Sequence, residues 1–236
     1  MKSFWFLVSR LLRYSRFCQF FKIKLKYCSL IFFPTSISTT LWLNPNYSNS
    51  DIDYINKNLK KGDTYVDIGA NIGHLALAAS NFVGINGTII AVEGNQRIAN
   101  FLKKNIKLNK KNISVFSCIV GNKVGFAGIQ NRKADDMNQI TQEGDQKMLT
   151  LDIICKSLDK INLLKIDVEG YELSVLEGGR ETLVKTDKVF IEIIDDLLAS
   201  FSSSSNQIFS YLNQSNFILD KKIDNSNYLF KKKTNE

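Results

Sequence analysis

The stretch Thr64-Tyr-Val-Asp-Ile-Gly-Ala-Asn-Ile-Gly73 has the pattern of a buried strand that runs into a glycine turn. Its first half is apolar, and a helical pattern follows it from His74 to Ser80. In an α/β sheet, ligands bind at the carboxyl ends of the strands, where such a turn opens onto a helix N-terminus. The stretch therefore predicts a strand–turn–helix unit that binds a ligand.

A second apolar run, Ile89-Ile-Ala-Val-Glu93, follows about twenty residues later and ends in an acid. A carboxylate at this place in an α/β unit accepts hydrogen bonds from the hydroxyls of a ribose. The glycine turn and the acid together predict a cofactor that contains adenosine. The alternative is a tight strand–helix turn that binds no ligand.

The glycine pattern selects among the adenosine cofactors. The turn has the form Asp67-x-Gly69-x-Asn71-x-Gly73, which lacks the G-x-G-x-x-G triple of dinucleotide sites. A P-loop would continue with Lys and then Ser or Thr, whereas this chain continues with His74-Leu75. An acid before the turn favours a ligand that carries an amino group and no phosphate, and S-adenosylmethionine has both properties.

A third stretch is more specific. Leu163-Leu-Lys-Ile-Asp-Val-Glu-Gly-Tyr-Glu-Leu-Ser-Val-Leu-Glu-Gly-Gly179 resembles the signature of the FkbM family of S-adenosylmethionine-dependent methyltransferases. That family also has a D-x-G-A-N-x-G turn, matched by Asp67 to Gly73. A Leu-Asp pair precedes its central strand, matched by Leu151-Asp152, and a later strand ends in an acid, matched by Val189-Phe-Ile-Glu192. The resemblance covers residues 62–195, more than half of the chain.

The resemblance implies a class I methyltransferase fold, which is α/β and Rossmann-like. Its sheet is mostly parallel, with helices on both faces and a C-terminal antiparallel strand pair. One departure is that the family usually has Glu-Pro after its second strand, where this chain has Glu93-Gly94; the ribose acid is retained. The residues expected to bind S-adenosylmethionine are Asp67, Gly69, Ala70, Asn71, Gly73, Glu93, Gly94 and Asp167.

Alternating strand and helix patterns along the chain agree with a parallel sheet and right-handed crossovers. Strands are predicted at 39–43, 64–68, 88–92, 113–120, 163–166, 188–193, 217–221 and 228–232, and helices at 51–59, 72–82, 96–108, 171–176 and 207–212. Residues 121–146 are polar and unpatterned, so we predict a long loop with at most short strands. This loop and the N-terminal segment are expected to shape the pocket of the methyl acceptor.

Methyl transfer from a sulfonium is an in-line displacement, and an alcohol acceptor must also lose its proton to a base or to a metal-held site. Asp167 is the first candidate for base or metal ligand, and Glu169 is predicted either to orient the substrate or to cap a helix. Glu192 and the single histidine, His74, are the other catalytic candidates. Lys165 is interpreted as a strand-face residue without a special role. Clustered acids also bind Mg²⁺ or Mn²⁺, so metal dependence stays open.

Composition limits the class of protein. With 236 residues the chain is long enough for one domain, and it carries four scattered cysteines and one histidine. This usage argues against a zinc site and a disulfide framework, and it suits the reducing cytoplasm.

The charge is uneven along the chain. Residues 1–33 hold seven cations and no acid, while the remaining 24 cations are balanced by 23 acids. We therefore separate a basic, aromatic and partly helical extension, residues 1–50, from a methyltransferase domain, residues 51–236. The apolar run of the N-terminal extension is too short to span a membrane. Two alternatives remain: peripheral contact of residues 1–33 with the inner face of the membrane, or packing on the domain. Phe4, Leu7, Val8, Leu11 and Leu12 recur at helical spacing, surrounded by Lys2, Arg10, Arg13 and Arg16.

The family resemblance implies O-methylation of a hydroxyl, either on a sugar of a cell-surface glycan, in polysaccharide biosynthesis, or on a secondary metabolite. The residues themselves imply only a cofactor site with acids opposite. A nucleic-acid methyltransferase is a second hypothesis because of the basic segment. Enzymes that methylate exocyclic amines typically have an Asn/Asp-Pro-Pro-aromatic turn, whereas this chain has Asp167-Val-Glu-Gly. A non-catalytic, membrane-associated scaffold with the same fold is a third.

Overall fold

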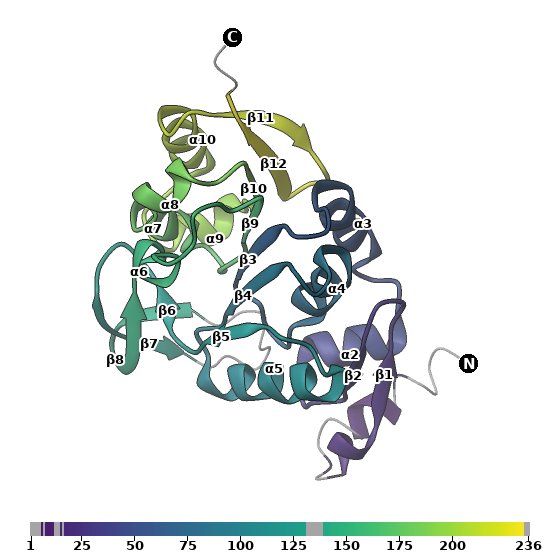
Figure 1. Ribbon diagram of the computed structural model, residues 1–236. Helices are drawn as coiled ribbons and strands as arrows, with labels where there is room; N and C mark the ends of the chain where they lie inside the picture. The colour runs from purple at the N-terminus through teal and green to yellow at the C-terminus, as the bar shows by residue number, and fades with distance from the viewer. Residues whose placement is uncertain (1–5, 7, 12–14, 16, 131–138, 234–236) are drawn as a thin grey trace.

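The computed structural model describes residues 6, 8–11, 15, 17–130 and 139–233. These residues include a central seven-stranded sheet (Figure 1). The strand order is β11-β12-β10-β9-β3-β4-β5. Neighbouring strands from β10 to β5 run parallel, and β12 runs antiparallel to both of its neighbours. The strands are β3 (Thr64–Ile68), β4 (Thr88–Val92), β5 (Ser114–Phe116), β9 (Leu163–Ile166), β10 (Lys188–Glu192), β11 (Phe217–Lys222) and β12 (Asn227–Lys232).

Helices cover both faces of the sheet (Figure 1). One face carries α3 (Asn49–Asn58), α4 (His74–Val83) and α5 (Gln96–Asn109); the other carries α6 (Leu151–Ile154), α7 (Glu172–Glu177), α8 (Arg180–Val184), α9 (Asp195–Ala199) and α10 (Ser205–Gln214). Successive residues of β3 belong to different core clusters, Tyr65 to the first and Val66 to the second. This alternation follows from the two-residue period of a strand, and burial on both faces explains the continuous apolar runs.

The N-terminal segment packs against the domain. It contains η1 (Cys18–Phe20), the hairpin of β1 (Lys22–Lys24) and β2 (Ser29–Ile31), and α2 (Ser36–Leu43). Asn105 and Asn109 of α5 accept hydrogen bonds from the backbone of Ile31 and Ser29, over 2.8 and 2.9 Å. Phe33 stacks on Phe101 with 4.0 Å between ring centroids. Packing on the domain is therefore observed for this hairpin.

The expected N-terminal helix is described only in part. Residues 6 and 8–11 are helical, which includes Val8, Arg10 and Leu11. Within the described part of the chain, no helix combines the length and hydropathy needed to cross a bilayer. The positions that lie outside the described residues are Lys2, Phe4, Leu7, Leu12, Arg13 and Arg16.

The strand predicted at 39–43 is wrong, because these residues end helix α2. Its β-branched and aromatic composition favours a strand in isolation. Here the Thr35 side chain caps the helix by accepting a hydrogen bond from the backbone of Ser38. The helix then buries Leu41, while Trp42 meets Phe32 edge-on with 5.5 Å between ring centroids.

The long loop predicted at 121–146 is also wrong. β7 (Gly125–Gln130) and β8 (Gln139–Leu149) form a three-stranded sheet with β6 (Ile119–Val120), in the order β6-β8-β7. The strand predicted at 113–120 is accordingly divided, since β5 belongs to the large sheet and β6 to the small one. Among the described residues, the fully buried apolar core of the small sheet is Ile119, Ala127 and Met148, and this small number explains the weak signal. The remaining predicted strands and helices are confirmed, with shifts of up to two residues at most ends.

Candidate functional site

A cavity of about 500 Å³ opens at the carboxyl ends of the central parallel strands. This is where open α/β sheets bind their ligands. Ile37 and Thr40 of α2 and Ile129 and Ile140 of the small sheet contribute to its walls, as expected of the two segments that contain them. Of the predicted site residues, the following line the cavity: Asp67, Gly69, Ala70, Asn71, His74, Glu93, Gly94, Asp167, Glu169 and Glu192.

Gly69 allows the turn after β3 to touch the end of β9. Its φ is +85°, and a Cβ there would overlap the carbonyl oxygen of Asp167. Gly73 also has a positive φ, +88°, but it does not contribute to the cavity lining. A side chain at Gly73 would instead meet Leu102 of α5. Gly73 therefore sets the packing of α4 against α5, and Gly69 sets the floor of the site.

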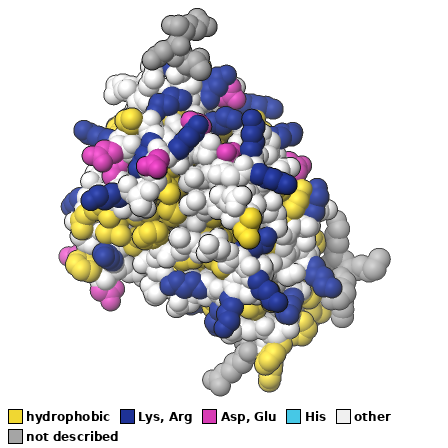
Figure 2. Space-filling model, in the orientation of Figure 1, with side chains coloured by type: hydrophobic (Ala, Val, Ile, Leu, Met, Phe, Trp, Pro, Cys, Tyr) yellow, Lys and Arg dark blue, Asp and Glu magenta, His cyan; other side chains and the backbone are white. Residues whose placement is uncertain are grey.

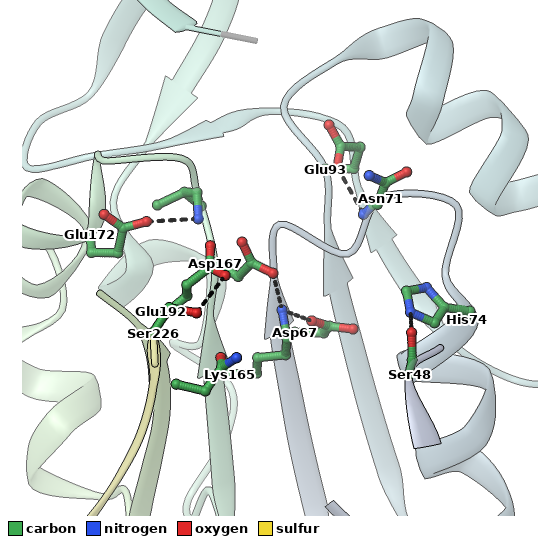
Figure 3. A network of polar contacts seen from close by, with 12 residues as sticks. Ser48, Asp67, Asn71, His74, Glu93, Lys165, Asp167, Glu172, Glu192 and Ser226 are labelled. Carbon is green, nitrogen blue, oxygen red and sulfur yellow. Dashed lines mark hydrogen bonds and ion pairs between the residues drawn. The ribbon is translucent and has the colours of Figure 1, made fainter. Parts of the chain in front are cut away.

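Glu93 lies beside the glycine turn at the end of β4. One carboxylate oxygen accepts a hydrogen bond from the backbone N–H of Asn71 over 2.9 Å (Figure 3). The other accepts from the backbone N–H of Asn95 over 2.8 Å. Burial raises its pKa to about 7, and the two backbone donors partly oppose that rise. Each oxygen keeps acceptor capacity for a further donor. The half-buried carboxylate thus fits the ribose hydroxyls of an adenosine cofactor.

Asp67 is fully buried at the end of β3. Neither of its oxygens has a hydrogen-bond partner among the described residues, although the Lys165 ammonium lies 3.8 Å from Oδ1. Burial raises the pKa of Asp67 to about 6, against the opposing effect of that ammonium. A buried acceptor without a donor is costly. The amino group of S-adenosylmethionine is a donor of the right kind, so the residues present fit this cofactor.

Lys165 is the residue that sequence reasoning misinterpreted. It is 5% exposed, and its Nζ lies 2.9 Å from Oδ2 of Asp167 (Figure 3). Burial acts to lower the pKa of Lys165, but Asp167 and Asp67 outweigh it, and the net shift is upward. The two-residue spacing of Lys165 and Asp167 places both on one face of the strand. That spacing was the available signal.

Glu192 stands at the end of β10, next to Asp167. Its Oε1 accepts a hydrogen bond from the Ser226 hydroxyl over 3.4 Å. Burial raises the pKa of Glu192, and the nearby Asp167 raises it further. Asp195, which follows in the sequence, instead accepts hydrogen bonds from the backbone and side chain of Ser205 and does not line the cavity.

His74 begins α4 and reaches the cavity wall. Its Nε2 is 3.0 Å from the Ser48 hydroxyl, and its Nδ1 is buried without a partner among the described residues (Figure 3). Burial lowers the pKa of His74 to about 4. The imidazole is therefore neutral at physiological pH, which also agrees with its place at a helix N-terminus.

Glu169 lines the cavity, and a neighbouring acid, Glu172, caps the turn that contains it. Glu169 has a left-handed backbone, with φ +56°. Glu172 receives hydrogen bonds from the backbone N–H groups of Val168 and Gly170, over 3.0 and 3.1 Å. The backbone cap of this turn is thus Glu172. Sequence reasoning missed it, although an acid at the start of a helix is a known signal.

Asp152 of the Leu-Asp pair lies outside the cavity lining. One of its oxygens accepts hydrogen bonds from the backbone N–H and the hydroxyl of Thr182, each over 2.7 Å. The other accepts from the backbone of Glu181. Asp152 therefore satisfies the free N–H groups at the start of α8 and joins it to α6.

The acids of the site do not form a metal centre. Among the described residues, no group of three or more His, Cys, Asp or Glu side chains is arranged to hold a metal ion. The positive charge that lies between the carboxylates of Asp67 and Asp167 is the Lys165 ammonium. This donor arrangement does not fit Mg²⁺ or Mn²⁺.

The strand order, the antiparallel β12 and the cavity at the switch point are those of a class I methyltransferase. The sequence model of the "Methyltransferase FkbM domain" matches residues 67–219. The chain belongs to this family and is an S-adenosylmethionine-dependent methyltransferase. The resemblance seen in the sequence is thereby confirmed. Among curated proteins, no sequence matches the chain.

Several solved structures are similar to the chain at low sequence identity. A putative rRNA-methylase from Clostridium thermocellum is 13% identical, covers 80% of this chain and 96% of its own, and has a TM-score of 0.49. An S-adenosylmethionine-dependent methyltransferase from Aquifex aeolicus is 17% identical, covers 79% of this chain and 90% of its own, and has a TM-score of 0.49. Aeropyrum pernix fibrillarin with natively bound S-adenosyl-L-methionine is 15% identical, covers 73% of this chain and 67% of its own, and has a TM-score of 0.45.

Proposed function

We propose that this enzyme methylates a hydroxyl of a neutral, hydroxyl-rich acceptor, either a sugar of a cell-surface glycan or a secondary metabolite. The observation that carries the proposal is the acidic rim of the cavity beyond the cofactor turn. Lys165 is the one cation among its described lining residues, and its charge is taken up by Asp167. The carboxylates of this rim are Asp51, Asp167, Glu169, Glu192 and Asp224.

The carboxylates of the rim select a methyl acceptor by the hydrogen-bond donors that it presents. They form strong hydrogen bonds with hydroxyl donors and repel phosphate or carboxylate groups. Ser226 and Asn227 add side chains that pair with both donors and acceptors of a sugar. A polyol satisfies such a rim, whereas a nucleic acid brings one negative charge per nucleotide. The rim therefore favours a glycan or metabolite over the nucleic-acid hypothesis.

The cofactor half is assigned from the opposite side of the cavity. Glu93 accepts hydrogen bonds from the ribose hydroxyls, and Asp67 accepts them from the amino group. Gly69 lets the ligand approach the backbone. When bound, S-adenosylmethionine supplies a methyl group already activated on a sulfonium. What remains for this chain is to align the acceptor oxygen and to remove its proton.

Glu192 is the better placed base. The Asp167 carboxylate is already engaged by the Lys165 ammonium, 2.9 Å away. Burial raises the pKa of Glu192 toward the working pH, where a general base is most effective. Glu192 takes the proton of the acceptor hydroxyl at its carboxylate, which leaves the acceptor oxygen nucleophilic toward the methyl group that a bound S-adenosylmethionine would supply. Asp167 and Glu169 then position the acceptor, and His74 is too weakly basic to compete.

The test is transfer of labelled methyl from S-adenosylmethionine to panels of neutral saccharides, hydroxyl-rich secondary metabolites, acidic saccharides and RNA. A neutral saccharide should retain the label after alkali, because methyl ethers survive where methyl esters hydrolyse. Glu192→Gln should reduce turnover by about 10²–10⁴-fold with little change in cofactor affinity. Asp167→Asn should have the smaller effect. Label in RNA, alkali-labile label, or no label in any panel with intact cofactor binding would contradict the proposal.

A further inference from the structure

Two aromatic side chains protrude from the N-terminal segment. Phe17 is 68% and Phe20 is 80% exposed, and their ring centroids are 6.3 Å apart. Figure 2 shows hydrophobic side chains at this lower edge of the molecule, beside a group of Lys and Arg side chains. Large aromatic residues usually bury most of their surface. A protruding pair therefore needs an explanation other than the core.

The base of this protrusion is fixed in the fold. Cys18 between the two rings is buried at 3% exposure, and its carbonyl accepts a hydrogen bond from the Phe21 backbone over 3.1 Å. The backbone of Phe32 in turn donates to the Phe21 carbonyl over 2.8 Å. The short η1 turn thus holds both rings outward from an anchored support.

Lysines lie near this aromatic pair. In β1, which begins just after Phe21, Ile23 faces the core while Lys22 and Lys24 are exposed. The Nζ of Lys104 in α5 is 3.3 Å from the side-chain oxygen of Gln19, the residue before Phe20. Lys107 is exposed one turn further along α5 and neighbours Lys104 on the helix surface. The sequence has no acid in residues 1–33 or in α5 to offset these charges. We call Phe17, Phe20, Lys22, Lys24, Lys104 and Lys107 the basic aromatic face.

We propose that the basic aromatic face docks on the surface of an anionic lipid bilayer. The rings enter the interface between headgroups and acyl chains, and the lysines contact the anionic headgroups. This inference is independent of the acceptor proposed above. A nucleic acid duplex fits less well, because it presents its phosphates outermost and offers no apolar layer for two exposed aromatic rings.

The test is co-sedimentation of the full chain with phosphatidylcholine vesicles that contain or lack phosphatidylglycerol. Binding is expected only with the anionic lipid and should weaken as salt rises. Phe17→Ser with Phe20→Ser should weaken binding at least about tenfold, because each ring loses its burial in the interface. Lys104→Glu with Lys107→Glu should weaken it by a similar factor. Equal binding of these variants and the parent chain would overturn the proposal.

Matched controls carry the same changes at the opposite side of the molecule. Val184→Ser and Lys156→Glu alter an exposed apolar residue and an exposed cation at α8 and after α6, and should leave vesicle binding unchanged. Calorimetry with S-adenosylmethionine checks that each variant is folded. Binding to a generic DNA duplex without binding to vesicles would overturn the proposal. So would a concentration-dependent dimer that Phe20→Ser dissociates, in a chain that does not bind vesicles.

Discussion

The Lys165 ammonium and the Asp167 carboxylate, 2.9 Å apart, connect the two halves of the cavity. The same ammonium lies 3.8 Å from the buried Asp67, on the cofactor side. One cation thus compensates an acid in each half. Removing that cation should affect both the stability of the fold and the charge of the site.

Lys165→Met should lower the free energy of unfolding by about 3–5 kcal/mol near pH 8, because it leaves buried carboxylate charge uncompensated. The loss should be smaller near pH 5, below the Asp67 pKa of about 6, because the protonated acid needs no counter-charge. Urea unfolding at both pH values measures this. The control is Lys160→Met, which breaks an exposed pair with Asp187, 62% and 43% exposed, and should cost about 0–1 kcal/mol. Equal losses in the two variants would contradict the role of Lys165.

The affinity for S-adenosylmethionine should rise as the pH passes through about 7, where Glu93 ionises. The ionised carboxylate is the better acceptor for ribose hydroxyls. Glu93→Gln should weaken binding by about 1.5–3 kcal/mol and remove most of this pH dependence. Calorimetric titration across this range measures both effects, with the exposed Glu181→Gln as control. A pH profile unchanged in Glu93→Gln would remove this residue from the cofactor site.

Ionisation of Glu93 also affects the free protein. Its folded pKa of about 7 lies above the reference value of 4.5, so folding takes up a proton between these values. The contribution of Glu93 to stability is therefore greatest at low pH and falls as the pH rises from about 4.5 to 7. Without cofactor, Glu93→Gln should flatten the fall in unfolding free energy over this window. If the unfolding free energy of Glu93→Gln fell more steeply with pH than that of the parent chain, the sign of the predicted pH dependence would be wrong.

Gly69→Ala and Gly62→Ala form a matched pair. Both glycines have nearly the same φ, +85° and +89°, so both changes introduce the left-handed strain of about 1–2 kcal/mol. At Gly62 no atom lies within 4 Å of the new Cβ, whereas at Gly69 it overlaps the Asp167 carbonyl. Gly69→Ala should therefore cost clearly more than Gly62→Ala in thermal unfolding and should also weaken cofactor binding. Similar melting temperatures for both variants would refute the close contact.

Glu172→Ala should lower the free energy of unfolding by about 1–3 kcal/mol, because the backbone N–H groups of Val168 and Gly170 lose their acceptor. Glu172→Gln keeps one oxygen and should recover much of the loss. Chemical denaturation distinguishes the two variants. If the amide variant is as unstable as the alanine variant, the negative charge and not the hydrogen bonding holds this turn.

The sequence predicted the sheet and the cofactor turn because their signals are local. β3 and β4 are short, mostly apolar runs that are buried after their first residue, and each ends in a residue that lines the site. The partner of each acid could not be predicted from the sequence, because it depends on which charged groups meet in space. Lys165 lies in an apolar strand context, and only the sheet register brings it beside Asp67.

The fold errors have a similar origin. Residues 39–43 are helical because Thr35 caps α2 and because Leu41 is buried against the domain, which intrinsic propensity does not record. The β7–β8 sheet has few apolar residues, and its strands are stabilised mainly by pairing with each other. Contacts made across the chain, rather than local pattern, determine both segments.

The walls of the cavity come from parts of the chain with different family relationships. The family match spans 67–219, and this span contains the cofactor turn, Glu93 and Asp167. The far wall includes Thr40 and Ser48 before that span and Asn227 after it. The cavity is therefore built jointly: the matched span supplies Asp167, Glu169 and Glu192, and segments outside the span close the rest of the wall. A description of this cavity requires the flanking segments as well as the matched domain, because neither part encloses it alone.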